Sequence, residues 1–65
     1  MVQINGQPVS DAEGRTLTAY LTQAGYTPSF VAVEKDGIII PRAQYADTVL
    51  CDGDTIEIVQ FVGGG

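Results

Sequence analysis

The chain ends in Gly63-Gly64-Gly65, the segment whose residue types best suit chemistry. Glycine has no Cβ, so a run of it can thread a narrow channel and adopt backbone angles that are closed to other residues. It also leaves no bulk beside the terminal carboxyl group. A tail of this kind could therefore enter a narrow active-site channel of another protein. The alternative is a frayed end or an expression remnant.

A few other side chains could take part in chemistry. Cys51 is the only cysteine and the chain has no histidine, so neither a disulfide framework nor a Cys/His metal site can be drawn. Nothing near it in sequence would activate the thiol, and we expect a small buried hydrophobic residue there. Asp52 and Asp54 flank Gly53, which is more typical of a turn than of a metal site. Arg42 either orients an acidic group of a partner or bonds to the backbone.

The charge balance limits the classes of partner. Eight acidic residues against three basic ones give a formal net charge of −5 over 65 residues. Phosphate backbones and anionic membranes repel such a surface, whereas a basic protein partner is compatible with it, and the charge also serves solubility. A chain of this length forms one domain at most, with little room for a cofactor cavity. The absence of a leader and the single thiol predict a cytoplasmic protein.

The first half of the sequence predicts a hairpin followed by one helix. Val2 and Ile4 alternate with polar residues, as in a strand with one buried face, and an Asn-Gly turn leads into a short second strand at residues 7–10. Pro8 suits an edge position there because it cannot donate to a ladder. An amphipathic helix is expected at residues 16–24, with Thr16 as its N-cap and Gly25 as its terminator.

The second half predicts three more strands. Residues 30–35 and 38–40 form a hairpin around Asp36-Gly37, residues 42–47 hold a single helical turn, and residues 55–61 form the last strand. One helix covering one sheet face is an α+β arrangement. We therefore predict a ubiquitin-like β-grasp: a mixed sheet of four to five strands packed on one α-helix. Its last strand is central and parallel to the first; residues 1–62 form the domain and residues 63–65 a flexible tail.

Strand alternation predicts an exposed apolar patch beside the tail. If Ile56 and Ile58 face the helix, other apolar side chains of the last strand and of the neighbouring one face away from it. These outward residues are Phe30, Ala32, Val59 and Phe61. Such a patch on a small monomer often marks a partner surface. The alternative is that a bulge or a loop covers these side chains as a satellite core.

Several short motifs occur in an order that resembles a known family. They are Val31-Ala32-Val33, then Ile40-Pro41-Arg42 with Tyr45 three residues on, then the Asp-Gly-Asp turn before a β-rich strand, and finally the terminal glycines. Together they resemble the sulfur carrier proteins of thiamin thiazole biosynthesis. The similarity covers essentially the whole chain.

The resemblance implies a function for Gly65. An activating enzyme related to ubiquitin E1 adenylates its carboxylate with Mg-ATP, and the adenylate becomes a thiocarboxylate whose sulfur passes to thiazole synthase. A sulfur donor protein such as a cysteine desulfurase is a further implied partner. The chain has no phosphate-cradling loop of its own, so we expect a carrier that is a substrate and not an enzyme, with no bound cofactor and no metal. Gly63 and Gly64, with the apolar patch, would contact the partners.

Three other functions fit the same sequence. The small subunit of molybdopterin synthase shares the fold and the glycine ending, although its members tend to be longer. A ubiquitin-like modifier would join its terminal glycine to lysines. A simple β-grasp interaction module would need no tail at all.

Overall fold

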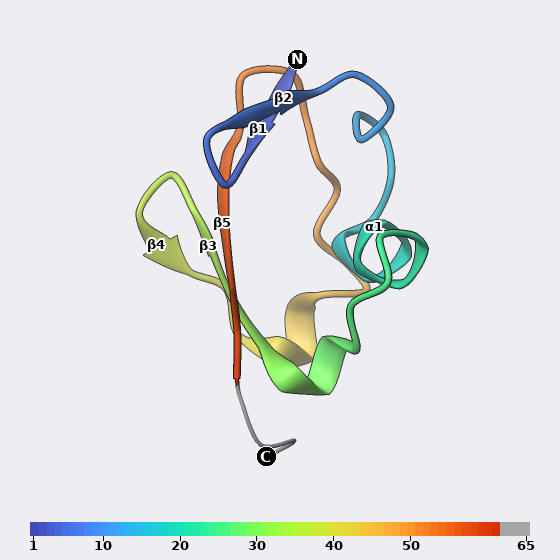
Figure 1. The fold of residues 1–65 in the computed structure, drawn as a ribbon, viewed down its shortest axis with the longest axis vertical. Coiled ribbons are helices and arrows are strands. Elements are labelled where there is room, and N and C mark those ends of the chain that lie inside the picture. Colours follow the sequence, from blue (N-terminus) through green and yellow to red (C-terminus); the bar gives the residue numbers. More distant parts are fainter. Residues whose placement is uncertain (62–65) are drawn as a thin grey trace.

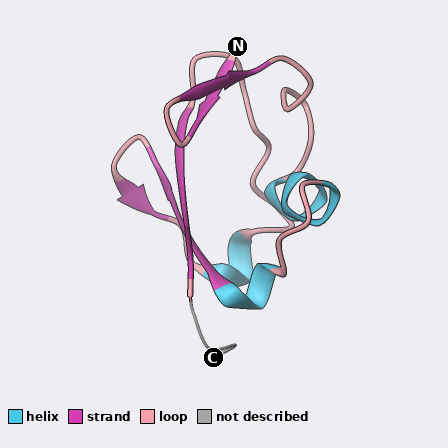
Figure 2. Ribbon diagram, in the orientation of Figure 1, coloured by secondary structure: helices cyan, strands magenta, loops and turns pink. Residues whose placement is uncertain are grey.

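The sheet is built from two hairpins and a closing strand that lies between them. A computed structural model describes residues 1–61 (Figure 1). Figure 2 shows the α-helix on one side of the strands, joined to them by loops and by two short 3-10 turns. In chain order the elements are β1 (Val2–Ile4), β2 (Gln7–Val9), α1 (Leu17–Gln23), η1 (Pro28–Phe30), β3 (Val31–Lys35), β4 (Ile38–Ile39), η2 (Arg42–Gln44) and β5 (Thr55–Gln60).

The strand order is β2-β1-β5-β3-β4, with β5 in the centre. β5 runs parallel to β1 and antiparallel to β3. Pro8 lies on the edge strand β2, opposite Gln3, where its missing N–H costs no ladder bond to β1. The topology confirms the predicted ubiquitin-like β-grasp, including the central, parallel last strand.

The helix begins and ends where the sequence predicts. The Thr16 Oγ1 accepts a hydrogen bond from the Ala19 amide at 3.1 Å, which satisfies one of the free donors of the first turn. Gly25 has a φ of 92°, a left-handed conformation that glycine adopts without strain. The stripe at Leu17 and Leu21 is fully buried against the sheet.

The core lies between α1 and the sheet and contains almost exclusively apolar side chains. Burying each large aliphatic side chain contributes about 1.5–3 kcal/mol. Tyr45, after η2, is also buried and places its ring in this layer. The buried apolar residues are Val2, Ile4, Ala12, Leu17, Leu21, Val31, Val33, Ile40, Tyr45, Leu50, Ile56 and Ile58.

Each hairpin turn also bonds to the central strand through its first residue. Asn5 and Asp36 both have a positive φ, 50° and 51°, as two-residue hairpin turns require. The Asn5 amide group accepts from the Ile58 N–H at 2.7 Å and donates to the Ile58 carbonyl at 3.2 Å. The Asp36 carboxylate accepts from the Thr55 N–H at 2.9 Å. Both side chains therefore extend the ladders that hold β5.

Four expected strands are one residue longer than the observed ones, because residues 10, 30, 40 and 61 lie outside β2, β3, β4 and β5. The difference at Phe30 changes the site. Phe30 ends the 3-10 turn η1, so the prediction of a strand through residues 30–35 is wrong at its first residue. Pro28 occupies the start of that turn, where its fixed φ suits a helical conformation. The alternation from which an outward Phe30 side chain was inferred holds only from Val31 onward. The predicted division into a domain of residues 1–62 and a flexible tail of residues 63–65 depends on residues outside the described range.

Replacing Asn5 tests its bonds to β5. We expect Asn5→Gly to lower the free energy of unfolding by about 1–2 kcal/mol, because glycine tolerates the positive φ but leaves Ile58 without its two partners. Urea denaturation followed by circular dichroism measures the change. Gln3→Ala, which alters an exposed side chain of β1, is the control and should have no effect. Equal stability of the Asn5→Gly variant and the wild type would contradict the assignment.

Candidate functional site

The candidate site lies at the carboxyl end of β5, which leads toward the glycine tail. The predicted reactive residues Gly63, Gly64 and Gly65 lie outside residues 1–61. Figure 1 shows this end of β5 at the opposite end of the domain from the N-terminus.

The predicted apolar patch is present in part. Ala32 and Val59 are directly opposite each other in the β3–β5 ladder, and Phe61 lies two residues beyond Val59. The Val59 and Phe61 side chains are 58% and 46% exposed, so no described loop covers them as a satellite core. Ala32 is half-buried. We call Ala32, Val59 and Phe61 the β5 patch.

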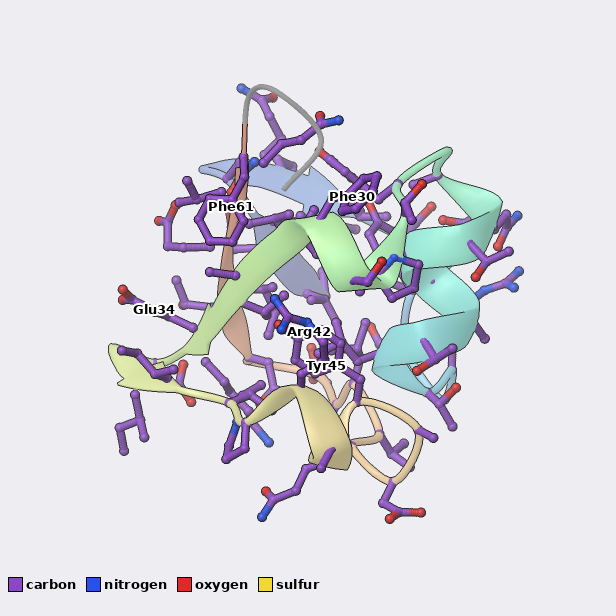
Figure 3. The ribbon with its side chains drawn as sticks, turned by 90° about the horizontal axis from the view of Figure 1, so that it is seen from below. Phe30, Glu34, Arg42, Tyr45 and Phe61 are labelled. Atoms are coloured by element: carbon purple, nitrogen blue, oxygen red, sulfur yellow. The ribbon has the colours of Figure 1, made fainter. Side chains whose placement is uncertain are left out.

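Phe30 does not join the β5 patch. Its carbonyl oxygen accepts the Phe61 N–H at 2.9 Å, so the two backbones pair. Figure 3 nevertheless shows the two side chains apart, with Phe61 beside β5 and Phe30 nearer to α1. The 3-10 turn causes this separation because it breaks the strand alternation. Partner binding by Phe30 remains a prediction, but as part of a separate surface.

Two carboxylates adjoin the β5 patch on the outer face. Glu34 and Glu57 are directly opposite each other in the β3–β5 ladder, two residue pairs along from Ala32 and Val59 and therefore on the same face of the sheet. None of the ion pairs formed by the described residues involves either glutamate. Like charges at directly opposed positions repel each other. The outer face therefore presents apolar side chains beside concentrated negative charge, which fits a basic partner surface.

Sequence reasoning missed this pair of glutamates. Alternation alone places Glu57 on the outer face, but only the register of β3 against β5 brings Glu34 opposite it. The Asp36-Gly37 turn could have indicated it. The turn fixes where β3 ends, and alternation along the strand before it then gives the face on which Glu34 lies.

Arg42 bonds to the backbone, the second of its two expected functions. Its guanidinium donates to the Val31 carbonyl at 3.3 Å, and the buried Tyr45 hydroxyl donates to the same oxygen at 3.1 Å. Figure 3 shows the two side chains converging beneath β3. Together they satisfy a β3 carbonyl that points away from β5, and so they fasten η2 to the start of β3. The shared acceptor explains the Arg42 and Tyr45 spacing structurally.

The Asp-Gly-Asp segment is a turn, as predicted. Asp52 contacts the Met1 ammonium group, whereas the Asp54 carboxylate accepts the Cys51 N–H at 2.8 Å and lies 3.6 Å from the Lys35 ammonium. The two carboxylates therefore contact different groups of the chain and do not form one site. No group of His, Cys, Asp and Glu residues within residues 1–61 could hold a metal ion.

The prediction for Cys51 is wrong: its side chain is exposed. The Asp54 side chain bonds to the Cys51 backbone and the turn directs the thiol outward, where it approaches the Val49 carbonyl at 3.6 Å. The alternation of side chains along a strand could not predict this exposure, because Cys51 lies in an irregular segment between Leu50 and the turn. No described cation contacts the sulfur, so the structure offers no activating group for it.

The remaining surface offers little for catalysis. A hollow beside β4 is lined by Ile38, Ile39 and Pro41 together with aliphatic and polar neighbours; the two isoleucines are 72% and 70% exposed, which sequence reasoning also missed. Burial raises the pKa of Tyr20 above its usual 10.0, with further contributions from Tyr26 and Asp11, so this phenol is neutral at physiological pH. Within the described residues no helix is long and apolar enough to cross a membrane.

Comparison with known proteins identifies relatives across the whole chain. The model of the ThiS family matches residues 2–65. The sulfur carrier protein ThiS of Bacillus subtilis is 39% identical over 66 residues, covering 100% of both chains. A crystal structure of the thiamine biosynthesis protein ThiS from Geobacter metallireducens superposes with a TM-score of 0.75 at 31% identity, covering 98% of this chain and 97% of that one.

A longer relative contains a segment similar to this chain. The thiazole synthase of Magnetococcus marinus is 39% identical over 64 residues, which are 98% of this chain but 20% of that protein. The chain therefore spans about a fifth of the length of this relative.

The exposure of Cys51 predicts that its side chain contributes little to stability. We expect Cys51→Ser to change the free energy of unfolding by no more than about 0.5 kcal/mol, because an exposed side chain away from packing has little to lose. Urea denaturation measures the stability, and reaction of the native wild type with a thiol reagent measures access. A loss well above this value, or a thiol that reacts only after unfolding, would show that Cys51 is buried.

Proposed function

The chain belongs to the ThiS family, and we propose that it is the sulfur carrier for formation of the thiazole ring in thiamin biosynthesis. The observation that carries this proposal is the similarity to the Bacillus subtilis sulfur carrier protein over the full length of both chains. The match of the family model extends through Gly65, so the terminal glycines lie within the family pattern.

The reacting group in this proposal is the carboxylate of Gly65. A carboxylate is a poor acyl donor because its leaving group would be oxide. Attack of the carboxylate on the α-phosphorus of ATP releases pyrophosphate and forms an acyl adenylate. The persulfide of a donor such as a cysteine desulfurase then attacks the acyl carbon and displaces AMP to give an acyl disulfide. A thiol reduces the S–S bond of this acyl disulfide, which leaves the thiocarboxylate and a disulfide. Sulfur thereby replaces one carboxylate oxygen, and that oxygen leaves with AMP.

The activating partner supplies the catalysis. Mg-ATP needs an electrostatic clamp on its phosphates, whereas this chain has a formal charge of −5 and a sequence without a phosphate-cradling loop. The carrier is therefore a substrate of an E1-like adenylyltransferase. It binds no cofactor, metal, nucleic acid or membrane, and it acts in the cytoplasm, where an exposed lone thiol stays reduced.

Thiazole synthase is the proposed acceptor of the sulfur. Support comes from the protein of that name in Magnetococcus marinus, which contains a segment similar to this chain within one polypeptide. A carrier segment joined to the enzyme that consumes its sulfur remains at a high local concentration. The same similarity favours the thiazole pathway over the molybdopterin pathway.

The β5 patch and the adjacent glutamates are the proposed docking surface. Val59 and Phe61 are exposed beside the tail, and Glu34 and Glu57 place negative charge next to them. Apolar anchors surrounded by charge are typical of specific protein interfaces. Gly63 and Gly64 would pass through the partner's channel, where side chains would obstruct them.

Altering the terminus tests the chemistry. We expect that deleting Gly65, or adding one residue after it, abolishes thiocarboxylate formation, because one residue moves the carboxylate by up to about 3.5 Å and a displacement of about 1 Å can cost roughly 10²-fold in rate. Each variant is incubated with the activating enzyme, Mg-ATP and a sulfur source, and intact mass then reports replacement of oxygen by sulfur.

Two controls accompany this experiment. Cys51→Ser should gain sulfur as the wild type does, because its thiol has no function in the reaction. Circular dichroism should show every variant folded, since the glycines contribute no side chain to the core. Normal thiolation of a variant with an altered tail would refute the carrier mechanism.

Substitutions in the β5 patch test the docking surface. We expect Phe61→Ala and Val59→Ser to weaken binding to the activating enzyme by about tenfold each while the fold survives, because truncating an interface anchor typically costs more than about 1 kcal/mol. Isothermal titration measures the affinity. Ile38→Ser, which alters an isoleucine that is 72% exposed on β4, is the matched control and should bind normally. Normal binding by both patch variants, or unfolding of both, would show the assignment to be wrong.

A further inference from the structure

The carboxyl half of β5 extends past its neighbour β1. The parallel ladder between them consists of two pairs, Gln3 with Thr55 and Ile4 with Ile56, after which the chain turns back at Asn5. Figure 1 shows β5 continuing below the β1–β2 hairpin, and within residues 1–61 this part of β5 forms a ladder with β3 alone. The other side of this half of β5 is therefore a sheet edge within the described structure.

The backbone groups of Gln60 face this edge. Successive residues of a strand direct their N–H and C=O groups to opposite neighbours. The Asp54 and Ile56 carbonyls accept from β1-side amides, those of Gln3 and Asn5, both at 2.9 Å. The Phe61 amide instead donates to Phe30 on the β3 side. By this alternation Gln60, like Asp54 and Ile56, directs its groups to the β1 side.

The Asn5 side chain satisfies the backbone groups of Ile58, which lies two residues before Gln60 on the same side of β5. Its amide both accepts from and donates to the Ile58 backbone, and so replaces the next β1 residue in the ladder. The next groups that face this side belong to Gln60, about 6.6 Å farther along the strand. No side-chain hydrogen bond or ion pair of residues 1–61 reaches them. Beyond Asn5, the first backbone N–H and C=O groups that face this sheet edge are thus those of Gln60.

We propose that an extended segment of the activating enzyme pairs with this edge of β5 and adds a strand beside Gln60. The inference rests on the function proposed above, because an enzyme that places the Gly65 carboxylate must hold the five preceding positions in a defined direction. Backbone pairing does this for any side chain, as in other peptides recognised by strand addition. The first contacts are donation by the Gln60 N–H and acceptance by the Gln60 C=O.

The outermost strands suit such pairing less well. In β2, Gln7 directs its backbone groups toward its partner Ile4 across the turn. The backbone groups that face outward from the sheet are therefore those of Pro8, which has no N–H. In β4 the same alternation leaves only Ile39 facing outward, because that strand has two residues and the Ile40 amide donates to Val33. The edge at Gln60 has both groups and continues toward the reacting terminus.

Proline at position 60 separates this backbone function from side-chain effects. Gln60→Pro removes an N–H that faces the open edge, so the ladder with β3 stays intact and the free protein should remain folded. We expect its affinity for the activating enzyme to fall at least tenfold. Gln60→Ala keeps the N–H, loses the same side chain, and should bind as the wild type does. Isothermal titration measures both affinities, and circular dichroism checks the fold.

Hydrogen exchange of the wild type gives a second readout that requires no substitution. In the free protein the Gln60 amide should exchange fast and the Phe61 amide slowly, because the latter bonds to Phe30. Adding the activating enzyme should slow exchange at Gln60. If the Gln60→Pro variant fails to fold, hydrogen exchange of the wild type by itself tests whether the edge at Gln60 pairs with the enzyme.

Three outcomes would overturn the inference: unchanged fast exchange at Gln60 in the complex, equal loss of affinity in Gln60→Ala and Gln60→Pro, or normal affinity of a folded Gln60→Pro. Failure of the proposed function looks different, since the wild-type terminus would then gain no sulfur by intact mass. Normal thiolation and normal affinity of a folded Gln60→Pro would reject strand addition alone and leave the carrier function standing.

Discussion

The pairing of β5 between β1 and β3 is the interaction on which the rest of the structure depends. β1 and β3 come from the two hairpins and have no ladder with each other, so the last strand joins them into one sheet. Ile56 and Ile58 of this strand also lie in the core, against the layer that contains Leu17 and Leu21. Closing a loop across nearly the whole chain costs entropy, which the buried side chains and ladder bonds must offset. The domain can therefore be complete only when its last strand is in place.

The two faces of β5 lie in different environments, and we propose that the outer face serves recognition. Side chains that alternate along one strand belong to different environments, and here Ile56 and Ile58 are buried whereas Val59 and Phe61 are exposed. A substitution on the outer face can thus alter binding without opening the core. In the proposed function, the docking surface therefore lies on the strand that precedes the reacting glycines in the sequence.

The turn residues have a similar double function. Asn5 and Asp36 permit the left-handed backbone of their hairpins, and their side chains also hold β5 from its two sides through Ile58 and Thr55. Asn5 also lies where the pairing of β1 with β5 ends, so the edge of β5 beyond Ile58 has no neighbouring strand among residues 1–61. A residue that looks like simple turn chemistry in the sequence therefore defines the boundary between the closed and the open part of the sheet.

The sequence by itself determined the element order, the helix ends, the turns and the β-grasp topology. These depend on local periodicity, on Thr16 and Gly25 as caps, and on the limited conformations of Asn-Gly and Asp-Gly turns, all of which act over a few residues. It also singled out the glycine tail and the outward Val59 and Phe61 side chains.

Only the tertiary structure decided the position of Phe30 in a 3-10 turn, the exposed Cys51 thiol, the bond from Arg42 to Val31, and the register that sets Glu34 opposite Glu57. Each of these depends on where distant segments stop and how they pair. A shift of register by one residue reverses the face of every side chain in a strand, and local propensity contains no information about that choice.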